Sequence, residues 1–326
     1  MIKNFWEKLP KPFFCLAPMA DVTDVAFRQI IEKYSRHGLP LGGPDVFWTE
    51  FVSADGLMSP GREVLKHDLR YSNKEHPIVA QLFGSHIEKM EGAARLCAEL
   101  GFDGIDINMG CPDKSIEKQS AGAAMIRNPE LARAIIRAAK RGAPNLPISV
   151  KTRIGYNKNE IEHWVPELLA ENISALTLHC RTRKEMSKVP ARWEHVREVV
   201  ALRDKLSPHT VIIGNGDVVD IADAKKKIKE TGCDGVMLGR AVFGNPWLFD
   251  QKKKELSTEE KLRVMVEHTK LFEKELGGIK SFAIMKKHYK AYVQGFDGAK
   301  ELREKLMEAE NATEIESIVN EFLSNQ

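Results

Sequence analysis

The feature that most constrains the fold is a regular alternation of short apolar segments with longer segments of helical character. Such alternation is typical of β-α-β units, in which helices connect buried parallel strands. About eight segments have strand character, which is the number that a (β/α)8 barrel requires. The predicted strands span residues 13–17, 45–51, 77–83, 104–108, 147–153, 175–179, 210–215 and 235–238.

Two of the intervening segments have clear helix ends. Segment 88–100 stops before Gly101 and segment 129–141 stops before Gly142, where a glycine suits the positive φ of a helix C-cap. A doubly wound sheet would also alternate strands and helices, but it more often binds a dinucleotide through a Gly-x-Gly-x-x-Gly turn. The sequence lacks that turn, so the TIM barrel is favoured.

Beyond about residue 255 the strand character ends, and the sequence reads as helices. The predicted helices span residues 258–276, 281–293, 299–308 and 312–323, with glycines between several of them. We therefore predict an α/β chain of two domains, a TIM barrel over residues 1–254 and an all-helical domain over residues 255–326. The 326 residues suit a barrel of about 250 residues with a small appendage.

Composition describes an ordinary globular chain, with 43% hydrophobic and 29% charged residues. Residues 1–12 lack the apolar run of a signal peptide or a membrane span, so we expect a cytoplasmic protein with no membrane contact. The five cysteines are scattered without a Cys-x-x-Cys spacing, which predicts buried thiols rather than disulfides or a metal site. A net charge of +3 permits RNA binding without requiring it.

Polar residues accumulate near the carboxyl ends of the predicted strands, where barrel enzymes place their active sites. On the fourth strand Asp106 and Asn108 alternate with isoleucines, and the strand leads directly to Cys111. On the fifth strand Lys151 and Arg153 share one face, where an unpaired buried cation would be costly. We therefore expect Lys151 to meet an anion or a cofactor. Gln81 and His179 add polar groups from the third and sixth strands.

The last two strands end in glycine-containing segments, Asn215-Gly216-Asp217 and Gly239-Arg240. Barrels commonly bind a phosphate group after strands seven and eight, where glycines let backbone N–H groups approach an anion. Arg240 would add a charged fork to that site. These residues predict a cofactor with a phosphate tail, and flavin mononucleotide (FMN) is favoured modestly over pyridoxal phosphate, thiamine pyrophosphate or a sugar phosphate.

Four motifs together resemble the tRNA-dihydrouridine synthase family. They are APMADVTD at residues 17–24, NMGCP at 108–112, KTR at 151–153, and GRA with GNPW at 239–247. The segments MKKHY at 285–289 and GFDG at 295–298 are similar to the RNA-binding domain of that family. The chain departs from the family pattern after His179, where Cys180 and the segment 189–193 replace the usual glycine-containing sequences.

The resemblance implies an FMN-dependent barrel that reduces uridines of tRNA to 5,6-dihydrouridine, with NADPH or NADH as the reductant and no required protein partner. Cys111 would donate a proton to C5 while hydride passes from flavin N5 to C6. Asn108 and Arg153 would hold the uracil edge, which suits an extruded base. The remaining implied residues contact FMN: Pro18, Met19, Ala20, Gln81, Lys151, His179, Asn215, Gly216, Asp217, Gly239 and Arg240.

A free thiol near pKa 8.5 is protonated at neutral pH, although a helix beginning at its loop would lower that pKa. Around residues 286–292, lysines beside Tyr289 and Tyr292 suit RNA phosphate and stacking contacts, or an ordinary amphipathic helix. Two other functions stay open, an FMN barrel for a small molecule such as dihydroorotate and a tRNA-binding protein without catalysis. The helical tail argues against the first, and Cys111 with Lys151 argues against the second.

Overall fold

The computed structural model describes residues 4–253 and 255–325. Eight parallel strands are hydrogen-bonded in the order β1-β8-β7-β6-β5-β4-β3-β2. The sheet closes where Cys15 pairs with Val46 and the Asp45 carboxylate accepts the Phe14 amide at 2.7 Å. The strands are β1 (Phe13–Leu16), β2 (Phe47–Ser53), β3 (Ile78–Phe83), β4 (Gly104–Met109), β5 (Ile148–Arg153), β6 (Ala175–His179), β7 (Val211–Asn215) and β8 (Gly235–Leu238).

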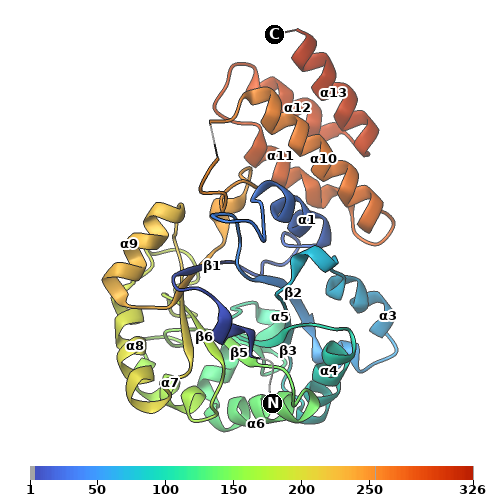
Figure 1. Cartoon of the computed structure of the whole chain (residues 1–326). Coiled ribbons are helices and arrows are strands. Elements are labelled where there is room, and N and C mark those ends of the chain that lie inside the picture. The colour runs from blue at the N-terminus through green and yellow to red at the C-terminus, as the bar shows by residue number, and fades with distance from the viewer. Residues whose placement is uncertain (1–3, 254, 326) are drawn as a thin grey trace.

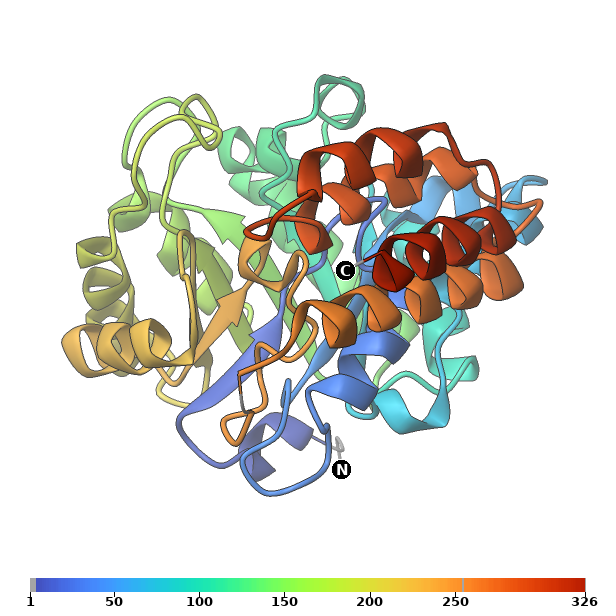
Figure 2. The ribbon, with the colours of Figure 1, turned by 90° about the horizontal axis from the view of Figure 1, so that it is seen from above.

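Helices occupy the connections between the strands and surround the sheet, as Figures 1 and 2 show. Several of them begin at a side-chain cap: Asp24 accepts the Phe27 amide at 2.9 Å ahead of α1, and Asn128 accepts the Leu131 amide ahead of α6. The helices are α1 (Val25–Tyr34), α2 (Ala54–Leu57), α3 (Arg62–Leu65), α4 (Ile87–Glu99), α5 (Lys114–Glu117), α6 (Pro129–Gly142), α7 (Ile161–Leu169), α8 (Glu194–Leu206) and α9 (Ile221–Thr231). Short 3-10 turns span Phe5–Lys8, Lys66–Leu69, Asn73–Glu75, Gly122–Arg127 and Arg240–Val242.

The predicted barrel is confirmed, with two local differences. The sequence predicts the second strand at residues 45–51, whereas β2 starts at Phe47 because Asp45 and Val46 close the barrel against β1. Gly101 has the expected positive φ of 85° after α4, but Gly142 belongs to α6 itself. A Cβ at Gly142 would lie 2.1 Å from the Glu91 carbonyl oxygen, so that glycine permits close packing of α6 on α4.

The chain ends in the predicted helices, which gather above the barrel in Figure 1. Their apolar side chains form a second hydrophobic cluster together with Val25, Ala26 and Ile30 of α1. The helix predicted at 281–293 is divided into a 3-10 turn, Phe282–Met285, and α11. The division into domains at residue 254 stays a prediction, and Lys254 lies outside the described residues. The helices are α10 (Thr258–Leu276), α11 (Lys286–Tyr292), α12 (Ala299–Glu308) and α13 (Ala312–Ser324).

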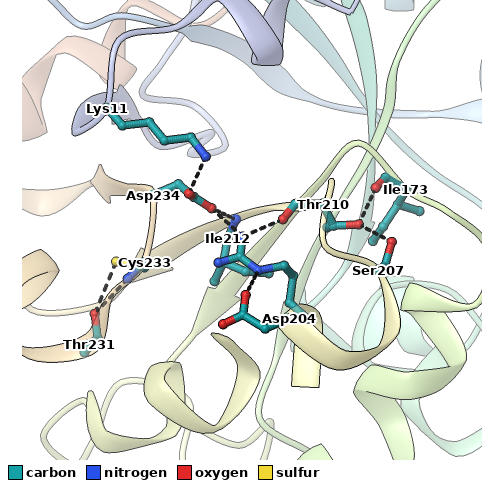
Figure 3. A network of polar contacts seen from close by, with 10 residues as sticks. Lys11, Ile173, Asp204, Ser207, Thr210, Ile212, Thr231, Cys233 and Asp234 are labelled. Carbon is teal, nitrogen blue, oxygen red and sulfur yellow. Dashed lines mark hydrogen bonds and ion pairs between the residues drawn. The ribbon is translucent and has the colours of Figure 1, made fainter. Parts of the chain in front are cut away.

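A buried polar network ties the amino-terminal ends of β7 and β8 together (Figure 3). Asp234 accepts hydrogen bonds from Lys11 Nζ at 2.5 Å, Arg203 Nη1 at 2.8 Å and the Ile212 amide at 2.8 Å. Burial alone would raise the pKa of Asp234, but these hydrogen bonds hold it below its usual value. Interactions at this end of a barrel stabilise the fold, so the functional site is expected at the opposite end.

The five cysteines are free thiols, and all except the partly accessible Cys111 are buried. The expectation that most cysteines are buried is therefore confirmed. Across residues 4–253 and 255–325, no helix has the length and apolar character needed to cross a membrane. The same residues contain no group of three or more histidine, cysteine, aspartate or glutamate side chains arranged to hold a metal ion.

Candidate active site

A cavity of about 620 Å³ lies at the carboxyl ends of the barrel strands, within the usual size range of small-molecule sites. Its walls come from the segments that follow β1, β6, β7 and β8 and from the end of β5. Several residues predicted from separate motifs meet there: Pro18, Met19, Lys151, Arg153, His179, Asn215, Gly216, Asp217, Gly239 and Arg240.

Four of the predicted site residues are not part of the cavity wall. Ala20 is exposed, in the segment that continues from Met19, and Gln81 is fully buried inside the barrel. Asn108 is buried and Cys111 is partly accessible, both beside the end of β4. The predicted roles of all these residues stay predictions.

The cavity has an excess of positive charge. Among the described residues that line it, four are cationic, Lys151, Arg153, Arg181 and Arg240, against one carboxylate, Asp217. Asp217 accepts hydrogen bonds from Arg240 Nη2 at 2.5 Å and from Arg181 Nη2, so it holds both guanidinium groups in place. Because several cations remain without a carboxylate of their own, the site suits an anionic ligand.

Burial changes the ionisation of two polar residues of the cavity. Burial lowers the pKa of Lys151 to about 8, and the charge of Arg153 adds to this effect. Burial also lowers the pKa of His179 well below its usual value, with further repulsion from Lys151 and Arg153. His179 is therefore neutral at pH 7, and its Nε2 accepts from Arg181 Nη1 at 3.2 Å. The remaining ring nitrogen, Nδ1, then carries the proton and can donate to a ligand.

The backbone after β7 lies very close to neighbouring side chains. Gly216 has a φ of 127°, and a Cβ there would lie 2.9 Å from the Ala191 Cβ and 3.2 Å from the His179 ring. The neighbouring Asn215 is fixed because its Nδ2 donates to the Met237 carbonyl oxygen at 2.8 Å. A glycine at residue 216 therefore lets this segment pack closely against Ala191 and the His179 ring at the cavity wall.

The Cys111 loop is held by a chain of buried hydrogen bonds. Asn108 Oδ1 accepts the Gly110 amide at 3.1 Å and the Cys111 amide at 2.9 Å. Asn108 Nδ2 donates to Gln81 Oε1 at 3.0 Å, and Gln81 Nε2 donates to Asp106 Oδ2 at 2.7 Å. The polar face predicted for the fourth strand thus points into the barrel and connects its core to the loop.

Arg153 holds the same loop from the other side. Its Nε donates to the Gly110 carbonyl oxygen at 2.7 Å, and its Nη1 donates to the Thr182 and Met186 carbonyl oxygens at 3.2 and 2.9 Å. Burial raises the pKa of Cys111, and the opposing effect of the Asp113 amide is smaller. The expected lowering by a following helix is therefore wrong, since α5 has a single turn and burial dominates.

Arg181 is a cavity residue that the sequence interpretation missed. It is buried, and its Nε donates to the Val189 carbonyl oxygen at 2.6 Å, so it also fixes the atypical segment after Cys180. Ser187 and Met237 line the cavity as well. The signal for Arg181 was present, because two arginines follow the predicted sixth strand within four residues.

The aromatic residues of α11 are part of the core. His288 and Tyr289 are fully buried and Tyr292 is 2% exposed, whereas Lys290 is exposed and Lys286 and Lys287 are partly exposed. Base stacking by the two tyrosines is therefore wrong as a prediction, because their rings pack inside the helical region. The lysines alone stay available for contacts with a phosphate backbone.

The family model described as Dihydrouridine synthase matches residues 15–326. A probable tRNA-dihydrouridine synthase of Staphylococcus aureus strain Mu50 is 40% identical over 325 residues, which cover 99% of this chain and 96% of that protein. Probable tRNA-dihydrouridine synthase 2 of Bacillus subtilis strain 168 is 39% identical and matches over 99% and 97% of the two chains.

Solved structures with the same architecture are more distant. Histamine dehydrogenase from Rhizobium sp. 4-9 has a TM-score of 0.51 at 12% identity, over 79% of this chain and 48% of that chain. A variant of NCR from Zymomonas mobilis has a TM-score of 0.50 at 16% identity, over 75% and 88%. At these identities the likeness concerns the fold alone. The family match over nearly the whole chain is decisive, and the protein belongs to the dihydrouridine synthase family.

Proposed function

We propose that this protein is a cytoplasmic tRNA-dihydrouridine synthase that uses FMN and NADPH, or NADH, to reduce the C5=C6 bond of uridines in tRNA. The observation that carries the proposal is the cation-lined cavity beside the Cys111 loop, in a chain of the dihydrouridine synthase family.

The cavity residues suit FMN in their charge and in the backbone segments that they offer to a phosphate group. Arg240, positioned by Asp217, and the glycine-containing segments at Gly216 and Gly239 would hold the phosphate tail, where the cations exceed the carboxylates. Lys151 and neutral His179 would donate to the ring or ribityl oxygens. Pro18, Met19 and Ala20 would line the ring through their backbone, and Gln81 would reach it from the barrel interior.

When bound and reduced by the nicotinamide, FMN supplies the hydride for C6 of uracil. The matching proton for C5 comes from Cys111, whose thiol stays protonated at pH 7 because burial raises its pKa. Asn108 binds the amides of the loop and Arg153 binds the Gly110 carbonyl oxygen, so the backbone that carries the thiol is held in one conformation. Such positioning makes proton transfer effective once the base is in place.

The hydrogen-bonding capacity of Asn108 and Arg153 defines how they would hold uracil. Asn108 Oδ1 already accepts two amides, so this side chain offers one remaining N–H. Arg153 uses Nε and Nη1 for backbone carbonyls and retains Nη2. Both residues would therefore donate to uracil carbonyl oxygens, and neither would accept the N3–H.

The test compares Cys111→Ala with Cys97→Ala, a control that removes a buried thiol from α4, which lies outside the cavity wall. Purified protein is examined for flavin by its visible spectrum, and the released cofactor is identified by mass spectrometry. Dihydrouridine formed in unmodified tRNA is measured by nucleoside mass spectrometry. We expect Cys111→Ala to retain FMN and lose about 10²- to 10⁴-fold in rate, the usual range for general acid catalysis.

Three results would contradict the proposal. They are a colourless protein that acquires no flavin, tRNA that gains no dihydrouridine with the wild-type chain, or a Cys111→Ala rate close to that of Cys97→Ala. The role of residues 255–326 in tRNA binding is tested by deleting them. Salt-dependent tRNA affinity that survives the deletion would contradict that role.

A further inference from the structure

A buried ion pair joins the helical region to the barrel. Lys280, which follows α10, and Glu50 on β2 are 230 residues apart in the chain, yet Lys280 Nζ lies 2.7 Å from Glu50 Oε2. Their side chains are 14% and 6% exposed. Removing one partner of such a pair leaves an uncompensated buried charge, so the two residues depend on each other.

The second oxygen of the Glu50 carboxylate contacts the segment that continues from the cavity wall. Glu50 Oε1 accepts the Asp21 amide at 2.5 Å. Asp21 has a φ of 53°, a left-handed conformation that a residue other than glycine keeps only where its surroundings hold it. Pro18 and Met19, a few residues earlier, form part of the cavity wall. A single carboxylate therefore connects Lys280 to the segment that leads out of the cavity.

The chain delivers Lys280 to this position through a tight turn. Gly278 has a φ of 75° and reverses the backbone after α10. Lys280 Nζ also contacts Asp68 Oδ1 at 2.8 Å, and Arg70 Nη1 donates to the Glu275 carbonyl oxygen at 2.6 Å. Figure 1 shows the end of α10 above the segment that contains α3. The end of α10 is thus fastened to the barrel at several points.

The charges around Lys280 explain why removing this lysine would disturb Glu50. Burial raises the pKa of Glu50, and Lys280 opposes this. Burial alone would lower the pKa of Lys280, but Glu50 and Asp68 raise it, so the lysine stays charged. Burial also raises the pKa of nearby Asp24 to about 6, and Glu50 adds to this rise. Without Lys280, Glu50 would face Asp68 and Asp24 without this counter-charge.

We propose that Glu50 is a positioning residue of the active site, through which Lys280 holds segment 18–21 in the conformation that lines the cavity. The helical region then stabilises the cavity wall, in addition to any role in RNA binding. The effect on FMN rests on the proposed function, whereas the effect on the backbone of segment 18–21 does not.

The experiment uses the full-length protein with its bound flavin and four single variants. Lys280→Met keeps the length of the side chain without its charge, and Lys280→Arg keeps the charge. Glu50→Gln places an amide against Lys280, and Lys270→Met is a control that removes an exposed ion pair of α10 with Glu316. Hydrogen exchange is followed in peptides over residues 18–24 and 276–285, and flavin release is followed by the recovery of free FMN fluorescence.

We expect Lys280→Met and Glu50→Gln each to raise exchange over residues 18–24 and to speed flavin release by about tenfold, a common size for coupling between sites. Lys280→Arg should stay within about threefold of wild type, and Lys270→Met should match wild type. The double variant Lys280→Met with Glu50→Gln should exceed neither single variant by much, because both remove one interaction.

Increased exchange confined to residues 276–285 in Lys280→Met would overturn the inference. So would additive effects in the double variant. Circular dichroism checks folding, and if Lys280→Met does not fold, Glu50→Gln gives the same comparison from the barrel side. A protein without flavin that still shows the exchange pattern would refute the proposed function and leave the role of Glu50 intact.

Discussion

Two histidines in the helical region predict a loss of stability in mild acid. His268 on α10 and His288 on α11 are fully buried, with ring centroids 4.7 Å apart. The His268 ring stacks on Phe27 at 5.0 Å, and the His288 ring stacks on Phe243 at 5.5 Å. Within the described residues, the ring nitrogens of both histidines have no hydrogen-bond partner. This environment favours the neutral rings, because nothing compensates a buried charge.

The sign and size of the effect follow from the pKa shifts. Burial lowers the pKa of His268 to about 3, and burial with repulsion from His268 and Lys287 lowers that of His288 well below its usual value. In the unfolded chain both rings take a proton near pH 6.5, so stability is present above that pH and falls below it. Between pH 7.5 and 5.0, proton uptake by His268 in the unfolded chain lowers the unfolding free energy by about 2 kcal/mol, and His288 acts in the same direction.

Other groups contribute to the pH dependence of stability with the opposite sign, so a variant is needed to isolate the contribution of the histidine. Burial raises the pKa of Asp24 and Asp106 to about 6, and these carboxyl groups stabilise the fold as the pH falls. We therefore compare wild type with His268→Leu, which cannot take up the proton. The stability of the wild type relative to the variant should fall by about 2 kcal/mol between pH 7.5 and 5.0.

The assay is equilibrium unfolding in urea, followed by circular dichroism at constant ionic strength and at pH values from 7.5 to 5.0. His209→Leu is the control, since His209 is exposed, and its stability curve should run parallel to that of wild type. A difference between wild type and His268→Leu that is the same at every pH would refute the reasoning.

Three further substitutions test the fold and the cavity. Asp234→Ala removes the acceptor shared by Lys11 and Arg203 and should lower the unfolding free energy by about 3 kcal/mol with unchanged flavin content; an unchanged urea midpoint would contradict this. Gly244→Ala, at a φ of 66° with a Cβ 2.1 Å from the Ala291 carbonyl oxygen, should destabilise the chain by at least about 1 kcal/mol in the same assay. Gly216→Ala should leave the circular dichroism spectrum unchanged and speed flavin release, and wild-type flavin release would contradict the assigned role of that segment.

Much of the barrel and several cavity residues could be predicted because they depend on local patterns. Parallel strands buried on both faces appear as short apolar segments, so the predicted and observed bounds agree closely, as for β6 and β8. The carboxyl ends of parallel strands meet at one end of a barrel, so the barrel topology alone predicts that polar residues at these ends lie close together. Lys151, His179 and Asn215 lie together for this reason.

The features that escaped prediction depend on contacts between distant segments. The arginines after the sixth strand are a local signal for a cation, but contacts with Asp217 and the Val189 carbonyl oxygen direct Arg181 into the cavity, and the sequence does not indicate these contacts. Glu50 and Lys280 meet only once α10 has packed on α1. Tyr289 belongs to a segment whose composition suits RNA binding, and only the packing of α11 shows that this tyrosine is buried.

The hydrogen bonds inside the barrel give a physical reason why its core and its proposed chemistry are linked. The Gly110 and Cys111 amides fix Asn108 Oδ1 as an acceptor, so Asn108 Nδ2 must face Gln81 Oε1. Gln81 Nε2 must then face Asp106, whose other oxygen accepts Ser149 Oγ at 2.6 Å. Each donor determines the next acceptor, and the series ends at a carboxylate, which accepts at both oxygens and donates nothing when it is ionised. Burial raises the pKa of Asp106 to about 6, so Asp106 is ionised at neutral pH, and a residue in the barrel core helps to orient the loop that carries Cys111.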